Sequence, residues 1–176
     1  MIIRTWIVLV VFIVVTQVAL ATETGLPFGI RAYSATPAPR FQLQNMDGES
    51  IDLQTLRDNW VFVHFWASWC GPCRLEMPAI EKLSQIITYD KLPIVMVNVA
   101  EDEDTVFSFL AEVTPTLDSF MDTDGQAIEA WKPRGLPATY LVDPAGNIRY
   151  QALGGREWHQ LEYTDFIKRV MRKKHE

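Results

Sequence analysis

The feature of the sequence that most constrains the fold is a strand that runs directly into a pair of cysteines. Residues 60–67 read WVFVHFWA, a β-branched and aromatic run that is typical of a strand buried on both faces. Cys70 and Cys73 follow at its carboxyl end, and apolar residues then recur at roughly helical spacing, at positions 75, 80, 83, 86 and 87. The order predicts that the cysteines lie where a buried strand meets the start of a helix, which Pro78 should bend.

The rest of the chain alternates between strand and helix patterns. Its 176 residues, 48% of them hydrophobic, are enough for one domain with a substantial core. A hairpin is predicted around Asp47-Gly48, and a second across 138–153 around Pro144-Ala145-Gly146. Further strands are predicted at 93–100 and 117–122, with helices at 101–113, near 126–131 and at 156–174. This alternation indicates an α/β fold built on a layered sheet.

The amino terminus carries a targeting signal. Residues 1–21 hold Arg4 ahead of an apolar run, and Ala19-Leu20-Ala21 has the small-x-small pattern of a signal-peptidase site. The same stretch is nearly long enough to be an uncleaved membrane anchor, so the sequence allows a cleaved signal peptide or a tether through residues 2–21. Either outcome exports the chain that follows. Residues 22–38, rich in Pro, Thr, Gly and Ala, are predicted to be a linker, and residues 39–176 the folded domain.

The two cysteines are best explained as a redox pair. A disulfide between them would close a loop of two residues, which is too short for much entropic stabilisation. A zinc site needs about four ligands, whereas the three histidines, at 64, 159 and 175, are scattered. We therefore expect neither a metal nor an added cofactor, only a redox-active Cys70–Cys73 disulfide. The formal net charge of -6 argues against nucleic acid as a partner.

The position of each cysteine predicts its role. If Cys70 caps the helix, unpaired backbone N–H groups and the helix dipole favour its thiolate, so its pKa should fall below the usual value of about 8.5. Cys73, one turn further in, should be more buried but able to attack a mixed disulfide formed at Cys70. Pro72 fits the first turn of the helix, where its missing N–H costs no helical bond.

The motif WCGPC after a hydrophobic strand resembles the active site of the thioredoxin superfamily. Pro78 matches the helix-bending proline of that family, and GLPATYLVD at 135–143 resembles its cis-proline segment, with Pro137 as the proline. The leading hairpin, the helix at 101–113 and the export signal resemble the TlpA/ResA-like branch of exported oxidoreductases. The resemblance covers about residues 39–173. It implies a thioredoxin fold, a central mixed β-sheet flanked by helices, with an N-terminal β-hairpin extension and a helical insert.

The resemblance also implies a substrate-binding rim around the cysteines. It assigns Trp69, Gly71 and Pro72 to this rim, together with Leu136 and Pro137. A cis bond at Pro137 would turn the backbone of Leu136 toward the sulfurs, where it could pair with an extended peptide. Trp66 fits either this docking surface or plain core packing.

Proton handling is where the sequence departs from the general thioredoxin pattern. His64 stands six residues before Cys70, where thioredoxins usually place a buried aspartate that accepts a proton. It could take the same role or simply be a satisfied core histidine. Glu76, three residues after Cys73, matches a glutamate with which ResA-like proteins tune the cysteine pair; otherwise it is a first-turn acid that favours the helix dipole. Ala138 replaces the acid that follows the cis-proline in CcmG-like relatives, which speaks against that branch.

The predicted function is an exported thiol:disulfide oxidoreductase. Cys70 would attack a disulfide of an extracytoplasmic protein, Cys73 would resolve the mixed disulfide, and a membrane thiol donor would re-reduce the pair. Alternatives are an oxidant or isomerase and a copper-binding thiol module. A peroxidase is disfavoured, because Ala67 stands where its Pro-x-x-x-Thr/Ser-x-x-Cys frame requires Thr or Ser. The expected location is periplasmic or otherwise extracytoplasmic, either soluble after cleavage or anchored to the inner membrane.

Overall fold

The computed structural model describes residues 25–114 and 116–172. The predicted targeting segment lies outside these residues. Within them, none of the helices has the length and apolar character that a membrane crossing requires. The elements along the chain are β1 (Ile30–Pro37), β2 (Gln42–Asn45), β3 (Ser50–Asp52), η2 (Leu53–Leu56), β4 (Val61–Trp66), α2 (Gly71–Ile86), β5 (Ile94–Val99), α3 (Glu103–Val113), β6 (Phe120–Asp122), α4 (Gln126–Trp131), β7 (Ala138–Val142), β8 (Asn147–Leu153) and α5 (Leu161–Arg172).

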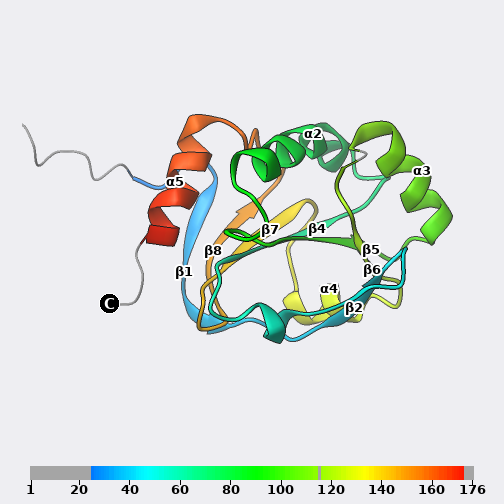
Figure 1. Cartoon of the computed structure of the whole chain (residues 1–176), viewed down its shortest axis with the longest axis horizontal. Helices are drawn as coiled ribbons and strands as arrows, with labels where there is room; N and C mark the ends of the chain where they lie inside the picture. Colours follow the sequence, from blue (N-terminus) through cyan, green and yellow to red (C-terminus); the bar gives the residue numbers. More distant parts are fainter. Residues whose placement is uncertain (1–24, 115, 173–176) are drawn as a thin grey trace, which may run out of the picture.

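One mixed sheet organises the domain. Its strand order is β1-β8-β7-β4-β5-β6-β2-β3. β4 lies near the middle, parallel to β5 on one side and antiparallel to β7 on the other. The helices α2, α3 and α5 cover one face, and α4 covers the other (Figure 1). All six residues of β4 are buried, because it has neighbours on both edges and helices on both faces. This confirms the predicted α/β fold and the predicted burial of this strand on both faces.

The two predicted hairpins are confirmed. β2 and β3 pair around a turn in which Gly48 adopts a φ of 79°. β7 and β8 pair around a turn closed by the Gly146 N–H, which donates to the carbonyl oxygen of Asp143 at 2.8 Å. Each turn therefore has a glycine where a side chain would be strained.

The predicted linker at 22–38 is wrong over most of its described length. Residues 30–37 form β1, which pairs antiparallel with β8 at the edge of the sheet. After Ile30 every residue of this strand is exposed. A strand with so little burial shows no apolar alternation, so its sequence resembles that of a tether.

Two helix predictions also need correction. The last helix begins at Leu161, not at residue 156, because residues 154–160 form a loop. Leu75, one of the apolar positions at helical spacing, is 80% exposed, and Leu161 at the start of the last helix is 77% exposed. Pro78 lies inside α2 as expected, where it donates no N–H to the preceding turn.

Candidate active site

Cys70 and Cys73 form a disulfide at the amino end of α2. The S–S distance is 2.09 Å. Cys70 is the N-cap residue of the helix, and its Sγ accepts the N–H of Cys73 at 3.3 Å. Cys70 is 6% exposed and Cys73 is fully buried. The helix therefore presents Cys70 toward the surface and holds Cys73 behind it, as predicted from their positions.

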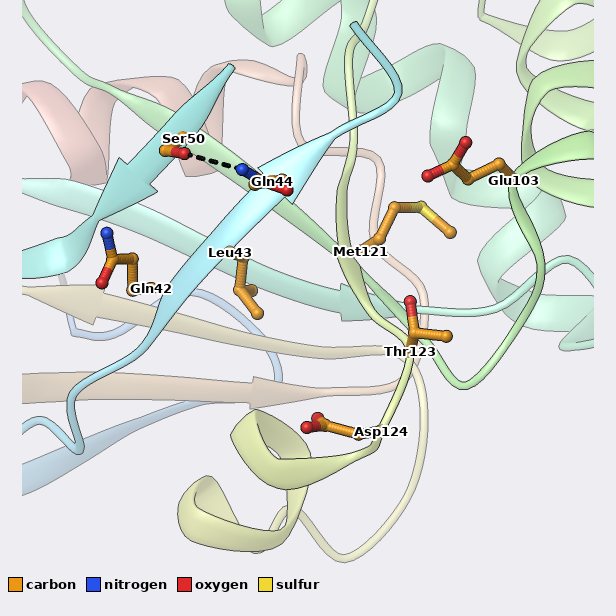
Figure 2. Close-up of a pocket in the computed structure, with 8 residues that line it drawn as sticks. All are labelled: Gln42, Leu43, Gln44, Ser50, Glu103, Met121, Thr123 and Asp124. Carbon is orange, nitrogen blue, oxygen red and sulfur yellow. Dashed lines mark hydrogen bonds between the residues drawn. The ribbon is translucent and has the colours of Figure 1, made fainter. Parts of the chain in front are cut away.

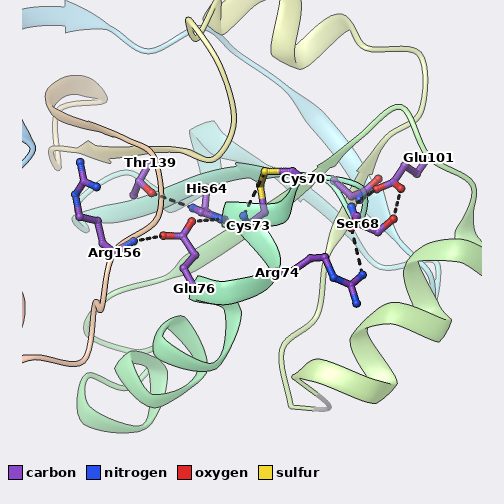
Figure 3. Close-up of a disulfide and its surroundings, with 10 residues drawn as sticks. His64, Ser68, Cys70, Cys73, Arg74, Glu76, Glu101, Thr139 and Arg156 are labelled. Atoms are coloured by element: carbon purple, nitrogen blue, oxygen red, sulfur yellow. Dashed lines mark hydrogen bonds and ion pairs between the residues drawn. A yellow bond between two sulfur atoms is a disulfide. The ribbon is translucent and has the colours of Figure 1, made fainter.

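A charged residue from outside the helix holds the turn that leads to Cys70. The carboxylate of Glu101, between β5 and α3, accepts the backbone N–H of Ser68 at 2.7 Å and also its hydroxyl. The side-chain amide of the buried Asn98 donates to the same carboxylate at 2.7 Å. From α2, the guanidinium of Arg74 donates to the carbonyl oxygen of Ser68 at 3.3 Å (Figure 3). No pattern in the sequence marks this clamp, because its members come from three separate segments.

The residues predicted to form the rim differ in exposure. Trp69 is 69% exposed, and Gly71 and Pro72 are exposed beside it. The Leu136–Pro137 peptide bond is cis, as predicted from the motif. Leu136 is half-buried and packs against the hydrophobic cluster that contains both cysteines.

Trp66 belongs to the core and not to the rim. It is fully buried, and its indole N–H donates to the hydroxyl of Ser119 at 3.0 Å. Its ring lies 5.2 Å from that of Phe109 on α3. Of the two interpretations that the sequence allowed, core packing is correct.

His64 and Glu76, which were predicted separately as candidate proton-handling residues, face each other. His64 lies on β4 and Glu76 on α2, and His64 Nε2 is 3.3 Å from Glu76 Oε1 (Figure 3). His64 Nδ1 is 2.9 Å from the hydroxyl of Thr139, the residue paired with it across the β4–β7 register. The other carboxyl oxygen, Glu76 Oε2, accepts the backbone N–H of Arg156 at 2.8 Å and the indole N–H of Trp158 at 3.1 Å.

Burial sets the charge state of this pair. Desolvation lowers the pKa of His64 from 6.5 to about 3. Desolvation likewise raises the pKa of Glu76 from 4.5 to about 8, against the opposing effect of its two hydrogen bonds and of the Arg156 charge. At neutral pH His64 is therefore neutral and Glu76 is protonated.

The contacts also locate that proton. Because Oε2 already accepts two N–H groups, a proton on Glu76 is best placed on Oε1, the oxygen that lies 3.3 Å from His64 Nε2. With the proton there, Nε2 is the unprotonated ring nitrogen and the hydrogen of neutral His64 is assigned to Nδ1, which lies 2.9 Å from the Thr139 hydroxyl. The protonated carboxyl of Glu76 is thus buried between β4 and α2, one helical turn from Cys73.

Three of the residues that contact the His64–Glu76 pair were not predicted from the sequence. Thr139 belongs to the GLPATYLVD motif, but its contact with His64 depends on the strand register. Arg156 and Trp158 come from the loop after β8, where the Gly154-Gly155 pair marks a turn without showing what the turn approaches.

A separate polar pocket lies near the far edge of the sheet. It is lined by residues of β2, β3 and β6, of the loop after β6 and of the first turn of α3: Gln42, Leu43, Gln44, Ser50, Glu103, Met121, Thr123 and Asp124 (Figure 2). None of these residues belongs to the disulfide site. Across the described part of the chain, no group of three or more His, Cys, Asp or Glu side chains is arranged to hold a metal ion.

Fold and site together define a thiol-disulfide oxidoreductase of the thioredoxin type. By sequence the chain belongs to the AhpC/TSA family, which matches residues 35–151, about two thirds of its length. It is 33% identical over 138 residues to thiol-disulfide oxidoreductase ResA of Halalkalibacterium halodurans, a match that covers 78% of each chain. It is also 33% identical over 111 residues to ResA of Bacillus subtilis, covering 63% of this chain and 62% of that relative.

Solved structures share the fold. A protein from Chlorobium tepidum, described as the thiol:disulfide interchange protein DsbE, superposes with a TM-score of 0.71 at 26% identity. The match covers 80% of this chain and 99% of that one. StoA from Bacillus subtilis superposes with a TM-score of 0.63 at 24% identity, covering 75% of this chain and 99% of that one.

Proposed function

We propose that the chain reduces disulfides of proteins outside the cytoplasm and is itself re-reduced by a membrane thiol donor. The observation that carries this proposal is the asymmetric cysteine pair, with Cys70 at the helix amino terminus and Cys73 fully buried behind it. The apolar run at residues 1–21 supports export, with either cleavage or retention as an anchor. An oxidising compartment would keep the pair as a disulfide, so a reductant there depends on a supply of electrons.

The reaction is a pair of thiol–disulfide exchanges. The Cys70 thiolate attacks one sulfur of the substrate disulfide, the substrate S–S bond breaks, and a mixed disulfide forms while one substrate thiolate leaves. The Cys73 thiolate then attacks Cys70 Sγ, the second substrate thiolate leaves, and the Cys70–Cys73 disulfide forms. Two electrons pass to the substrate, whose two thiolates take up protons.

The His64–Glu76 pair handles the proton of Cys73. In the disulfide state the pair holds one proton on Glu76, and reduction of the disulfide by the donor releases Cys73 as a thiolate that needs a proton. Transfer from the pair would neutralise this buried thiolate, which is otherwise costly in an apolar site. In the reverse step the Glu76 carboxylate would accept the Cys73 proton and generate the resolving nucleophile.

The exposed rim binds the substrate chain. The exposed Trp69 side chain, next to Cys70 in the chain, and the half-buried Leu136, which packs against the cluster that contains Cys70, would offer apolar contacts. An extended peptide that pairs with the backbone at Leu136 would bring its disulfide to Cys70.

Trapping tests the assignment of the two cysteines. The full chain with Cys73→Ser, reduced and then mixed with insulin, should accumulate a mixed disulfide through Cys70, because no resolving thiol remains. The matched Cys70→Ser variant should accumulate little. Capture through Cys73 in the Cys70→Ser variant, with none in Cys73→Ser, would contradict the proposed roles.

Turnover assays test the proposed disulfide reductase activity and distinguish it from a peroxidase activity. With dithiothreitol as donor, the wild-type chain should accelerate insulin reduction and neither single variant should. The same protein should not consume hydrogen peroxide, since the peroxidase frame is absent at Ala67. Peroxide turnover without insulin reduction would overturn the proposal.

A further inference from the structure

The loop between β8 and α5 supplies both hydrogen bonds that hold the Glu76 carboxyl. The backbone N–H of Arg156 and the indole N–H of Trp158 both donate to Glu76 Oε2. In Figure 3 the backbone of Arg156 is turned to the carboxyl and its side chain is directed away from it. The Arg156 side chain therefore contributes to this site without touching the reacting atoms.

The Arg156 guanidinium fixes the loop by binding carbonyl groups. It donates to the carbonyl oxygens of Leu153 and Gly155, each at 2.8 Å. A third bond, at 3.4 Å, reaches the carbonyl oxygen of Gly29, and the guanidinium carbon lies 5.7 Å from the centre of the Phe28 ring. Within residues 25–114 and 116–172 no carboxylate forms an ion pair with Arg156. The cation is thus used to tie the loop to the segment just before β1.

Two glycines make this arrangement possible. Gly29 has a φ of 75°, and a Cβ there would overlap the guanidinium of Arg156. At Gly155 a Cβ would stand 3.1 Å from the carbonyl oxygen of Pro72, on the active-site helix. The loop therefore packs closely against both the N-terminal segment and the first turn of α2.

We propose that Arg156 is a positioning residue for Glu76, and that it couples this proton-holding carboxyl to the N-terminal segment at residues 26–29. This inference rests on the proposed role of Glu76 as the proton carrier for Cys73. Through Arg156, a displacement of the N-terminal segment changes the hydrogen bonding of Glu76. In the sequence this segment follows the predicted export signal. The proposed coupling therefore links the chain next to that signal, through Arg156 and Glu76, to the disulfide.

The charges around Glu76 fix the direction of the effect. Neutral His64 faces it from β4, the charges of Arg156 and Glu157 act on it from the loop, and Cys73 shares its helix. The Arg156 hydrogen bond and charge both favour the ionised form of Glu76, whereas Glu157 opposes it. Loss of the Arg156 side chain removes the cation and loosens the loop, and both changes disfavour ionisation.

The test follows the titration of Glu76 in the oxidised protein, where no cysteine titrates. The Trp158 indole bonds directly to Glu76, so its ¹H–¹⁵N resonance, assigned through Trp158→Phe, reports the protonation state. In the full chain Arg156→Ala should raise the titration midpoint by about one pH unit. Gly29→Ala leaves the Arg156 charge in place but displaces the guanidinium, and it should also raise the titration midpoint.

Gly48→Ala is the matched control. Gly48 also has a positive φ, of 79°, but a Cβ there meets nothing within 4 Å, so this variant bears the backbone strain without disturbing Arg156. Its midpoint should equal that of the wild type. An unmoved midpoint in Arg156→Ala would overturn the positioning role, and a shift in Arg156→Ala but not in Gly29→Ala would overturn the coupling to the N-terminal segment. Because the titration needs no substrate, these outcomes are independent of whether the wild type reduces insulin.

Discussion

Replacement of Glu76 by Gln gives the sharpest energetic test of the buried pair. Gln is nearly isosteric with Glu, its carbonyl oxygen can accept the two N–H groups that now bond to Oε2, and its amide can donate to His64. It thus reproduces the protonated carboxyl but cannot ionise. At pH 6 the variant should fold normally, and its difference from the wild type should grow as the pH rises.

The magnitude follows from the two pKa values. Unfolded Glu76 ionises near 4.5, and burial raises the pKa in the folded state to about 8. Between these values the folded chain holds a proton that the unfolded chain has lost, so the free energy of unfolding falls as pH rises. From pH 6 to pH 8 the loss due to Glu76 is about 2 kcal/mol, and it levels off above the folded pKa.

Urea unfolding of the oxidised proteins between pH 6 and pH 8 measures this loss. Other titrating groups act equally in both chains, so the difference between the Glu76→Gln variant and the wild type isolates Glu76. We expect this difference to move in favour of Glu76→Gln by about 2 kcal/mol across the window. Parallel curves for the two proteins would show that Glu76 does not titrate there and would refute the buried protonated carboxyl.

Three further outcomes follow from individual contacts. In the same assay, the free energy of unfolding of His64→Gln should rise by about 2 kcal/mol relative to that of the wild type from pH 6 to pH 4. Over this range the unfolded wild-type chain protonates His64, whereas the folded chain, in which burial lowers the pKa to about 3, does not, so the wild type alone loses stability. A constant difference would contradict this. Asp122→Ala should lower the free energy of unfolding by about 2 kcal/mol, since its fully buried carboxylate accepts two backbone N–H groups at the start of α4. Glu101→Ala should cost a similar amount, about 2 kcal/mol, and should also slow insulin reduction, because the turn before Cys70 loses its acceptor; unchanged turnover would mean that the clamp is only structural.

The fold is predictable where burial leaves a pattern in the sequence. β4 is buried along its whole length and reads as an unbroken apolar run, so its place at the centre of the sheet can be inferred. β1 escapes prediction because it is an exposed edge strand whose residues carry no alternation. The spacing of the apolar residues on this helix suggests that Leu75 is buried, yet its side chain is 80% exposed. An apolar residue at near-helical spacing can still face solvent beside an active site.

The site is predictable as a set of residues but not as an arrangement. The greater burial of Cys73 follows from the order of the cysteines at a helix start, and the motif locates Pro137. His64 and Glu76 can each be nominated from their spacing to the cysteines. Their mutual contact depends on how β4 and α2 pack, and the donors from Arg156 and Trp158 come from a loop 80 or more residues away from Glu76 in sequence, which spacing cannot place.

The reduction potential of the Cys70–Cys73 couple is the decisive measurement for the proposed function. It would be measured on the full chain in thiol redox buffers at neutral pH, with the oxidised fraction quantified by alkylation of the free thiols. We predict a value near about -270 mV, the range of a thioredoxin-type reductant. A value near about -120 mV would make the chain an oxidant that introduces disulfides, and would contradict the proposed direction of electron flow.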